Sequence, residues 1–345
     1  MERYPRQSRF SRQRRAVGQA GYLTFGLSFA SLFTQPTTSR LVTTQHVSVL
    51  LNETLDNLNI KPGGRYIDGT VGGGGHSEAL LASAPDVELL GLDADPAAIE
   101  RAAIRLRPFG SRVKLVNANF SQLGDVARAQ HFDQVDGIVL DLGLSSDQLG
   151  DADRGFGFIA GGPLDMRFDP TRGQSAADLC NTLDADELAE LIYQFGEEPA
   201  SRKIARSIVA ARPIHSADQL ADVIEQAIGR RGRLHPATLT FQALRIAVND
   251  ELGALMSALP QAMLLLRPGG RVAIISFHSL EDRIVKEYFR AAAQEHVAQP
   301  DDPPGMVYRS ATLRLITRKP IVASEAEVLS NPRARSAKLR IAEKI

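Results

Sequence analysis

The sequence predicts an α/β fold in which a mostly parallel sheet of seven strands is interrupted by an inserted helical subdomain. Three observations lead to this prediction. Short apolar runs alternate with helical patterns, four consecutive glycines follow the first such run, and residues 147–247 carry mostly helical patterns. A strand, a glycine-rich turn and a helix in succession form the place where α/β sheets bind nucleotides, so we expect a ligand site there.

Length and composition limit the classes of protein. A chain of 345 residues is long for one core, so we expect two domains or one domain with a large insertion. Hydrophobic residues make up 43%, which excludes wholesale disorder. Cys180 is the only cysteine, which excludes an internal disulfide and a cysteine-rich zinc site and fits a reducing compartment. The formal net charge is zero, so a nucleic-acid site would need locally gathered basic groups.

Residues 1–45 differ from the rest of the chain. They are rich in arginine, and no acidic residue occurs between Glu2 and Glu53. The apolar stretch from Tyr22 to Phe33 is too short and too interrupted to cross a bilayer. We interpret 1–45 as a flexible extension that arises from a misassigned start, with a signal peptide or an organelle transit peptide as the alternatives.

From His46 onward, strand and helix patterns alternate as in parallel sheets. The expected strands are 66–68, 87–92, 113–117, 137–141, 271–276, 313–317 and 338–342. The expected helices are 49–58, 78–83, 96–106, 184–195, 201–211, 217–228 and 238–251. The sheet domain is therefore expected at 46–146 and 248–345, with 147–247 as an inserted helical subdomain.

The glycine run 72–75 can take positive φ and lets a ligand approach the backbone. A dinucleotide fingerprint needs a third glycine, but Ser77 or Glu78 stands at that spacing, which weakens a pyrophosphate interpretation. Asp93 ends the second strand, where a carboxylate suits ribose hydroxyls. These residues predict an adenosine-containing ligand without saying which one.

Basic residues gather at two places in the predicted insertion. They are Arg202, Lys203, Arg206 and Arg212, and then Arg230, Arg231 and Arg233. Such clusters can follow a phosphate backbone. Taken alone, a solvated helix face explains them better.

Four features together resemble class I S-adenosylmethionine-dependent methyltransferases. The first strand ends in Asp68 and the glycine run, and the second ends in Asp93. A polar-aromatic corner at 117–120 follows the third strand, and a Pro-Gly-Gly turn at 268–270 precedes the fifth. The resemblance implies a Rossmann-like fold with S-adenosylmethionine as the cofactor.

Longer runs resemble the MraW family of ribosomal small-subunit methyltransferases. These runs cover 46–51, 66–70, 141–146, 154–156, 162–167, 235–238, 241–246, 276–283 and 331–336. The departures are the N-terminal extension and Gly73, where family loops often carry a larger residue. The resemblance implies methylation of the N4 amine of a cytidine in the decoding region of small-subunit ribosomal RNA, in the bacterial cytoplasm and with the small subunit as the partner.

The same resemblance implies the residues of the site. Cofactor contacts fall on Gly74, Gly75, His76, Asp93, Phe120, Asp141 and Gln148. RNA contacts are expected at Arg230, Arg231, Arg233, Arg333 and Arg335. Asp141 is also the candidate catalytic residue, because it ends the fourth strand where amino methyltransferases often carry an Asp/Asn-Pro-Pro-aromatic motif; here the motif is replaced by Asp-Leu-Gly-Leu.

Chemistry supports nitrogen as the methylated atom. A cytosine carbon-5 methyltransferase needs a cysteine nucleophile, and Cys180 lies in an apolar helical pattern. An exocyclic amine needs only to be held in line with the methyl group and offered a hydrogen-bond acceptor. Asp141 could serve the cofactor, the amine, or both.

Two further patterns are interpreted as decoys. The run 154–159 imitates an RNA-stacking strand but has Gly161 where an aromatic is required, which leaves a smaller role for Phe156 or Phe158 in stacking. His235 and His278 could ligate a metal. We assign no second metal ligand three or four positions after either histidine, so no metal site is predicted.

Several alternatives stay open at this point. The protein could be a methyltransferase of the same fold acting on another RNA or substrate, a nicotinamide-dependent oxidoreductase, or an RNA-binding module without activity. Binding of S-adenosylhomocysteine rather than NAD would separate the first two. The sequence does not decide whether the protein forms a homodimer, or whether it acts on free RNA or on the assembled subunit. No membrane partner is expected.

Removal of residues 1–42 should leave methyl transfer in vitro unchanged, because nothing in this segment fits the predicted sheet. Initial rates of the full-length and truncated proteins, compared at equal folded concentration, test this. A loss of more than about tenfold would show that the extension is functional.

Overall fold

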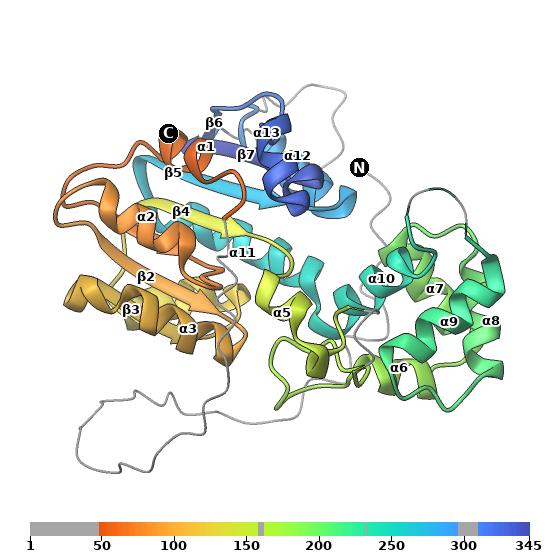
Figure 1. Cartoon of the computed structure of the whole chain (residues 1–345). Coiled ribbons are helices and arrows are strands. Elements are labelled where there is room, and N and C mark those ends of the chain that lie inside the picture. The colour runs from red at the N-terminus through yellow and green to blue at the C-terminus, as the bar shows by residue number, and fades with distance from the viewer. Residues whose placement is uncertain (1–47, 158–161, 231, 233, 296–309) are drawn as a thin grey trace, which may run out of the picture. The chain divides into compact units, whose positions relative to one another are not determined.

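One sheet organises the chain in the computed structural model, which describes residues 48–157, 162–230, 232, 234–295 and 310–345 (Figure 1). Its strand order is β3-β2-β1-β4-β5-β7-β6. The strands are β1 Arg65–Asp68, β2 Glu88–Asp93, β3 Val113–Asn117, β4 Val135–Asp141, β5 Leu266–Ser276, β6 Leu313–Leu315 and β7 Lys338–Lys344. Strands β1 to β5 run parallel to one another, and β7 is antiparallel to both β5 and β6.

Helices cover both faces of the sheet, as a parallel sheet requires. The flanking helices are α1 Leu51–Leu58, α2 Gly75–Ser83, α3 Pro96–Leu106, α4 Leu123–Ala129, α11 Glu251–Leu265 and α12 Ser279–Ala292. Alternate residues of each strand point to opposite faces. In β1, Tyr66 packs with Leu80 and Leu81 of α2, whereas its neighbour Ile67 packs with Leu259 of α11 and Val285 of α12.

A separate core lies in the inserted segment. Five helices form it: α6 Ala176–Thr182, α7 Ala185–Gly196, α8 Ser201–Ala210, α9 Ala217–Ile228 and α10 Thr238–Asn249. Their apolar stripes, including Ile192, Ile208 and Leu244, are completely buried against one another. Short elements complete the described chain: α5 Ser146–Gly150, α13 Glu325–Ser330, and 3-10 turns at Arg107–Arg112, Phe120–Gln122, Ala152–Arg154 and Pro332–Ser336.

The α/β fold with a seven-stranded sheet is confirmed, and all seven predicted strands are present. The fifth strand begins at Leu266 rather than at 271, because Leu266 already pairs with Val135 of β4. The helix predicted at 238–251 is two helices, since Asp250 takes a left-handed conformation with φ 51° between them.

The predicted division into a sheet domain and an insertion stays a prediction. Residues Gln45–Ile345 form one compact unit, and the segment predicted as the extension lies outside the described residues. α5, at the start of the predicted insertion, contacts the start of α3 through Gln148, whose amide donates to the N-cap residue Asp95. In the part of the chain that the structure describes, no helix is long and apolar enough to cross a membrane.

A Gly196→Ala substitution should destabilise the inserted helices. A Cβ at position 196 would lie 2.6 Å from the carbonyl oxygen of Leu239, a backbone atom of α10 that cannot rotate away. We expect a loss of about 1–3 kcal/mol in the free energy of unfolding, measured by urea denaturation. Gly150→Ala is the matched control, because nothing lies within 4 Å of its added Cβ. Equal stability of the two variants would contradict the close packing of α7 on α10.

Candidate active site

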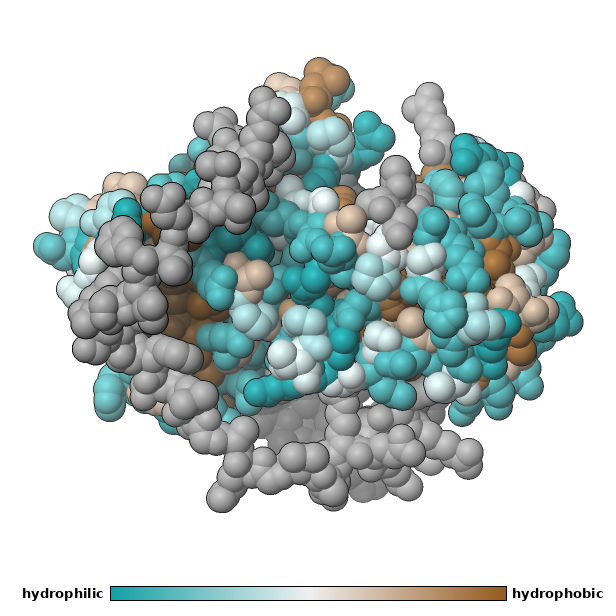
Figure 2. Space-filling model, turned by 60° about the horizontal axis from the view of Figure 1, so that its bottom comes forward, coloured by the Kyte–Doolittle hydropathy of each residue, from teal (hydrophilic) through white to brown (hydrophobic). Residues whose placement is uncertain are grey.

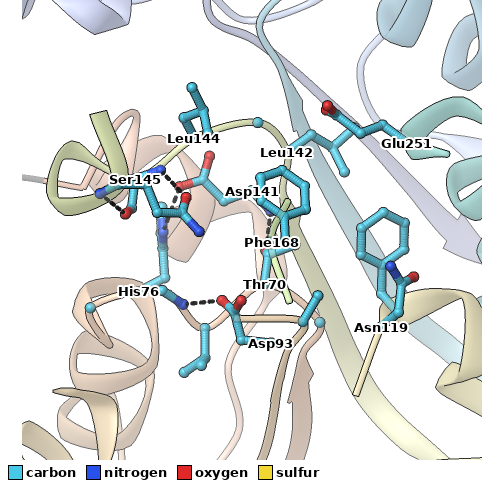
Figure 3. A pocket seen from close by; sticks show the side chains of 18 of the residues that line it. Thr70, His76, Asp93, Asn119, Asp141, Leu142, Leu144, Ser145, Phe168 and Glu251 are labelled. Carbon is cyan, nitrogen blue, oxygen red and sulfur yellow. Dashed lines mark hydrogen bonds and ion pairs between the residues drawn. The ribbon is translucent and has the colours of Figure 1, made fainter. Parts of the chain in front are cut away.

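A pocket opens at the carboxyl ends of β1, β2 and β4, where the strand order reverses direction (Figure 3). It holds about 900 Å³ of empty space, part of it open to solvent. Its walls come from the loops after these strands, from Phe168 and Glu251 of the insertion and its border, and from Arg333 near the C-terminus. In Figure 3, Asp93, Asp141 and Phe168 extend toward this shared space.

Asp68 fixes the glycine turn after β1. Its side chain is 1% exposed, and its two oxygens accept from the Thr70 amide at 3.1 Å and the Ser77 hydroxyl at 2.7 Å. One carboxylate thus ties the start of the turn to the first turn of α2. Burial raises the pKa of Asp68, while the Ser77 hydrogen bond opposes the rise. Gly72 and Gly74 take φ values of 52° and 80°, which few other residues tolerate.

Asp93 lies at the end of β2, facing the glycine turn. One oxygen accepts from the Gly72 amide at 2.8 Å and the other from the Asp95 amide at 2.9 Å. Each carboxylate oxygen has a second lone pair, so both can still accept a hydroxyl. Burial raises the pKa of Asp93 to about 6, and the group is therefore mostly ionised above pH 7.

Gln148 is held in the pocket by its neighbours. Its amide nitrogen donates to Asp95 at 2.9 Å, and its amide oxygen accepts from the Ser145 backbone in a capping box that starts α5. Arg154 donates to the same Asp95 oxygen at 3.2 Å and to the carbonyl oxygen of Phe168 at 3.0 Å. Sequence reasoning assigned Arg154 no role of this kind, although its Arg-Gly-Phe run was recognised.

Asp141 ends β4 and lines the pocket. Its amide donates to the Thr70 hydroxyl at 2.6 Å, and its Oδ2 lies 3.6 Å from Nδ1 of His76. Its Oδ1 is buried without a hydrogen-bond partner among the described atoms. Burial raises the pKa of Asp141 to about 7, against the opposing charge of Arg333, so the group can take up a proton near neutral pH.

Five of the seven residues predicted to contact the cofactor line the pocket. These are His76, Asp93, Phe120, Asp141 and Gln148. Gly72 and Gly73 line it as well, whereas Gly74 and Gly75 are not among its lining residues, and their contact with the cofactor stays a prediction. Gly75 packs so closely on Ser48 that a Cβ would lie 2.0 Å from its hydroxyl oxygen.

The predicted RNA contacts are dispersed. Arg333 lines the pocket and donates to the Ser146 hydroxyl at 2.7 Å, whereas Arg335 is exposed to solvent. Arg230 pairs with Glu225 at 2.6 Å, and Arg231 and Arg233 lie outside the described residues. Their role in RNA binding stays a prediction.

Arg212, unlike Arg230, is held by backbone acceptors. It donates to the carbonyl oxygens of Cys180 and Leu183 and so joins α6 to the loop before α9. Its guanidinium is therefore occupied by backbone acceptors, and a phosphate contact is not needed to explain it.

Phe156, in the run 154–159 that imitates an RNA-stacking strand, has a structural role. Phe156 is 5% exposed and stacks on Phe168, with ring centroids 5.7 Å apart. Phe156 therefore supports Phe168, which lines the pocket, and Phe158 lies outside the described residues. Cys180 is buried in the helical core, and burial raises its pKa to about 12, so its thiol is unsuited to nucleophilic attack.

A cluster beside the pocket was missed from the sequence. Glu281 follows His278 by three positions, and the two side chains and Glu251 bring potential ligand atoms within 4.8 Å of one another. The argument that His278 has no partner at this spacing was therefore wrong. The Glu281 amide donates to Nδ1 of His278 at 3.4 Å, so a neutral ring carries its hydrogen on Nε2, toward Glu281, and has no lone pair for a metal. Arg245 donates to Glu251 at 2.7 Å and balances its charge, so we assign the cluster to an internal ion network.

The strand order, the antiparallel β7 and the acidic ends of β1, β2 and β4 around one pocket define a Rossmann-like class I methyltransferase. The cofactor of this class is S-adenosylmethionine. The chain belongs to the MraW methylase family, which matches residues 43–345.

Relatives named "Ribosomal RNA small subunit methyltransferase H" are similar over most of their length. The protein from Dehalococcoides mccartyi is 53% identical over 302 residues, 87% of this chain and 86% of the relative. Those from Thermomicrobium roseum and Geobacter sulfurreducens are 52% and 51% identical and are covered to 95% and 100%. A solved putative rRNA methylase from Clostridium thermocellum has a TM-score of 0.42 at 14% identity, over 87% of this chain and 99% of that one.

The residues of the pocket fit S-adenosylmethionine. Asp93 has a free lone pair on each oxygen for ribose hydroxyls, and Gly72 and Gly73 leave the adjacent backbone open. Oδ1 of Asp141 has no hydrogen-bond partner among the described residues. A carboxylate oxygen of this kind suits a positively charged ligand, and the sulfonium group of S-adenosylmethionine is positively charged.

An Asp93→Ala substitution should weaken binding of S-adenosylhomocysteine by about 2 kcal/mol, or roughly 30-fold, because charge-assisted hydrogen bonds to the ribose are lost. Isothermal titration calorimetry measures the change. Asp125→Ala is the control, since Asp125 is an exposed carboxylate of α4 that pairs with Arg128 and does not line the pocket. An unchanged affinity in Asp93→Ala would remove Asp93 from the ribose site.

Proposed function

We propose that this chain transfers a methyl group from S-adenosylmethionine to the N4 amine of a cytidine in the decoding region of small-subunit ribosomal RNA. Family membership and the names of relatives above 50% identity support the RNA as substrate. The observation that carries the choice of atom is Asp141, a carboxylate with a pKa of about 7 in the pocket. The family also favours a methyltransferase over a nicotinamide-dependent oxidoreductase.

The only cysteine supports nitrogen over carbon 5. Carbon-5 methylation of cytosine requires a thiolate that adds to the ring. Cys180 lies in α6, in the core of the inserted helices, and is completely buried. An amine needs no covalent intermediate, so a carboxylate acceptor suffices.

Asp141 has two tasks in the proposed reaction. The lone pair of the exocyclic amine is delocalised into the ring, so its hydrogens must be oriented for the lone pair to point at the methyl carbon. The bound cofactor supplies the methyl group. Asp141 accepts a hydrogen bond from the amine, and then takes the proton that the nitrogen loses. The hydrogen bond from its amide to Thr70 keeps Asp141 at the end of β4.

Apolar side chains shape the place for the base. Leu142, Leu144 and Phe168 line the pocket beside Asp141, and their surfaces can exclude water and stack on a ring (Figure 3). The target base must leave its stack to enter, so the flanking nucleotides need to be held elsewhere. We assign this task to the predicted insertion, with Arg230, Arg231 and Arg233, and to Arg333 and Arg335 near the C-terminus.

The described atoms on the face drawn in Figure 2 are mostly hydrophilic, with hydrophobic residues in small separate groups. Such a face suits a polar partner better than an apolar dimer interface. We place the reaction on the ribosomal small subunit in the bacterial cytoplasm, and the homodimer stays a prediction.

Small subunits from a strain that lacks this enzyme should gain one N4-methylcytidine when incubated with the protein and labelled S-adenosylmethionine. Mass spectrometry of nuclease fragments identifies both the position and the modified atom. Asp141→Asn should reduce the rate at least about 100-fold, as for loss of a proton acceptor, while S-adenosylhomocysteine still binds.

Two results would contradict the proposal. A label on cytosine carbon 5 or on another class of RNA would refute the substrate assignment. Near-normal turnover by Asp141→Asn would remove Asp141 as the acceptor. Asp125→Asn, on the exposed face of α4 and outside the pocket lining, controls for the loss of a carboxylate.

A further inference from the structure

The ring of His76 has a defined tautomer. His76 lies in the first turn of α2 and is 5% exposed. Its Nε2 is 3.1 Å from the carbonyl oxygen of Val49, and a carbonyl oxygen can only accept a hydrogen bond. Nε2 therefore carries a hydrogen, and in the neutral ring Nδ1 carries a lone pair.

That lone pair faces a carboxylate. Nδ1 of His76 is 3.6 Å from Oδ2 of Asp141, which is within ion-pair range but longer than a formed hydrogen bond, so the two groups must approach each other for a hydrogen to be shared. Two acceptors that face each other in a buried place repel unless one hydrogen lies between them. Burial lowers the pKa of His76, so the ring stays neutral and the hydrogen belongs to the carboxyl group of Asp141.

We propose that Nδ1 of His76 is the built-in acceptor for the hydrogen of protonated Asp141, and that this pairing lets Asp141 collect the proton released when the target amine is methylated. His76 is thereby a positioning residue that acts through Asp141. The catalytic part of this inference rests on the proposed function.

The step balances as follows. The amine lone pair forms the bond from nitrogen to the methyl carbon, and the electrons of the carbon–sulfur bond go to sulfur, which loses its positive charge. The electrons of one N–H bond return to nitrogen, and its proton binds a carboxylate oxygen of Asp141. The resulting O–H at Oδ2 then donates to Nδ1 of His76.

The His76–Asp141 pair holds the proton and does not pass it on through the His76 ring. Beyond His76, the ring's other nitrogen already donates to Val49, whose carbonyl has no proton to pass on. The stored proton must therefore return to the pocket side of Asp141 and leave when the product departs. The released proton therefore does not exchange with solvent during the methylation step.

The charged groups around the pair come from three other elements. Asp68 on β1 faces His76, and its charge favours a protonated ring. Glu281 on α12 raises the pKa of Asp141, and Arg333 near the C-terminus lowers it. The net result is a pKa of about 7 for Asp141, so its proton-accepting form grows as pH rises through that value.

Nitrogen-15 NMR of the free full-length protein tests the pair without RNA or cofactor. Between pH 5 and 9 we expect His76 to stay neutral with the hydrogen on Nε2, and its Nδ1 resonance to shift near pH 7 as Asp141 loses the hydrogen that it donates. In Asp141→Asn, where the side-chain amide can donate at every pH, this shift should vanish. A hydrogen on Nδ1, an imidazolium at pH 7, or an Nδ1 signal independent of pH would overturn the inference.

A second measurement uses the pH profile of methyl transfer. His76→Ala removes the acceptor and admits water to Asp141, and both changes lower the proton affinity of Asp141. The midpoint of the rising limb should move to lower pH by at least about one unit. Ser83→Ala, an exposed change at the end of the same helix, should leave the midpoint in place. An unmoved midpoint in a folded His76→Ala variant would overturn the role of His76.

The two proposals fail separately. If the NMR result holds but ribosomal RNA gains no methyl group, the pair stands and the proposed substrate falls. If N4-methylcytidine forms while the NMR shows no hydrogen between Asp141 and His76, the function stands and the pair falls.

Discussion

The carboxylates of Asp68, Asp93 and Asp141 end three neighbouring parallel strands and are largely withdrawn from water, and the site depends on how each is compensated. An unpaired buried charge costs several kcal/mol, so each carboxylate needs hydrogen-bond donors or a proton. Asp68 has the Thr70 amide and the Ser77 hydroxyl, and Asp93 has two backbone amides. Asp141 has no donor on Oδ1 and faces His76 from Oδ2, and burial raises its pKa to about 7, so it can bind a proton near neutral pH.

The same constraint explains the glycine turn. For the Gly72 amide to reach Asp93 while the chain turns into α2, Gly72 and Gly74 adopt positive φ. The turn then presents the backbone of Gly72 and Gly73, without side chains, to the pocket beside Asp93. A binding surface for a nucleoside thus follows from the way in which the chain satisfies a buried carboxylate.

The insertion contributes to the site as well as to its own core. Asp95 anchors Gln148 and Arg154, and Arg154 in turn holds the backbone at Phe168, which lines the pocket. Arg245 at the end of α10 binds Glu251 at the start of α11, so the helices on either side of Asp250 are joined by a buried ion pair. A displacement of the inserted helices would therefore shift Phe168 in the pocket wall, where the target base is proposed to bind.

The sequence by itself determined the seven strands, helices α1–α3 and α7–α10 and the class of fold, because apolar periodicity and the glycine and aspartate residues at strand ends are local patterns. Longer runs that resemble the MraW family indicated the family. The two longest helices of the described chain, α11 and α12, were not predicted. The sequence also singled out Asp93, Asp141 and His76. Only the tertiary structure decided that Gly72 and Gly73, not Gly74 and Gly75, line the pocket, and that Arg333 lies in its wall. It alone showed that Nδ1 of His76 faces Asp141, and that Glu251 meets His278 and Glu281. These are contacts between residues tens to hundreds of positions apart, and they depend on side-chain directions and helix packing that no local pattern encodes.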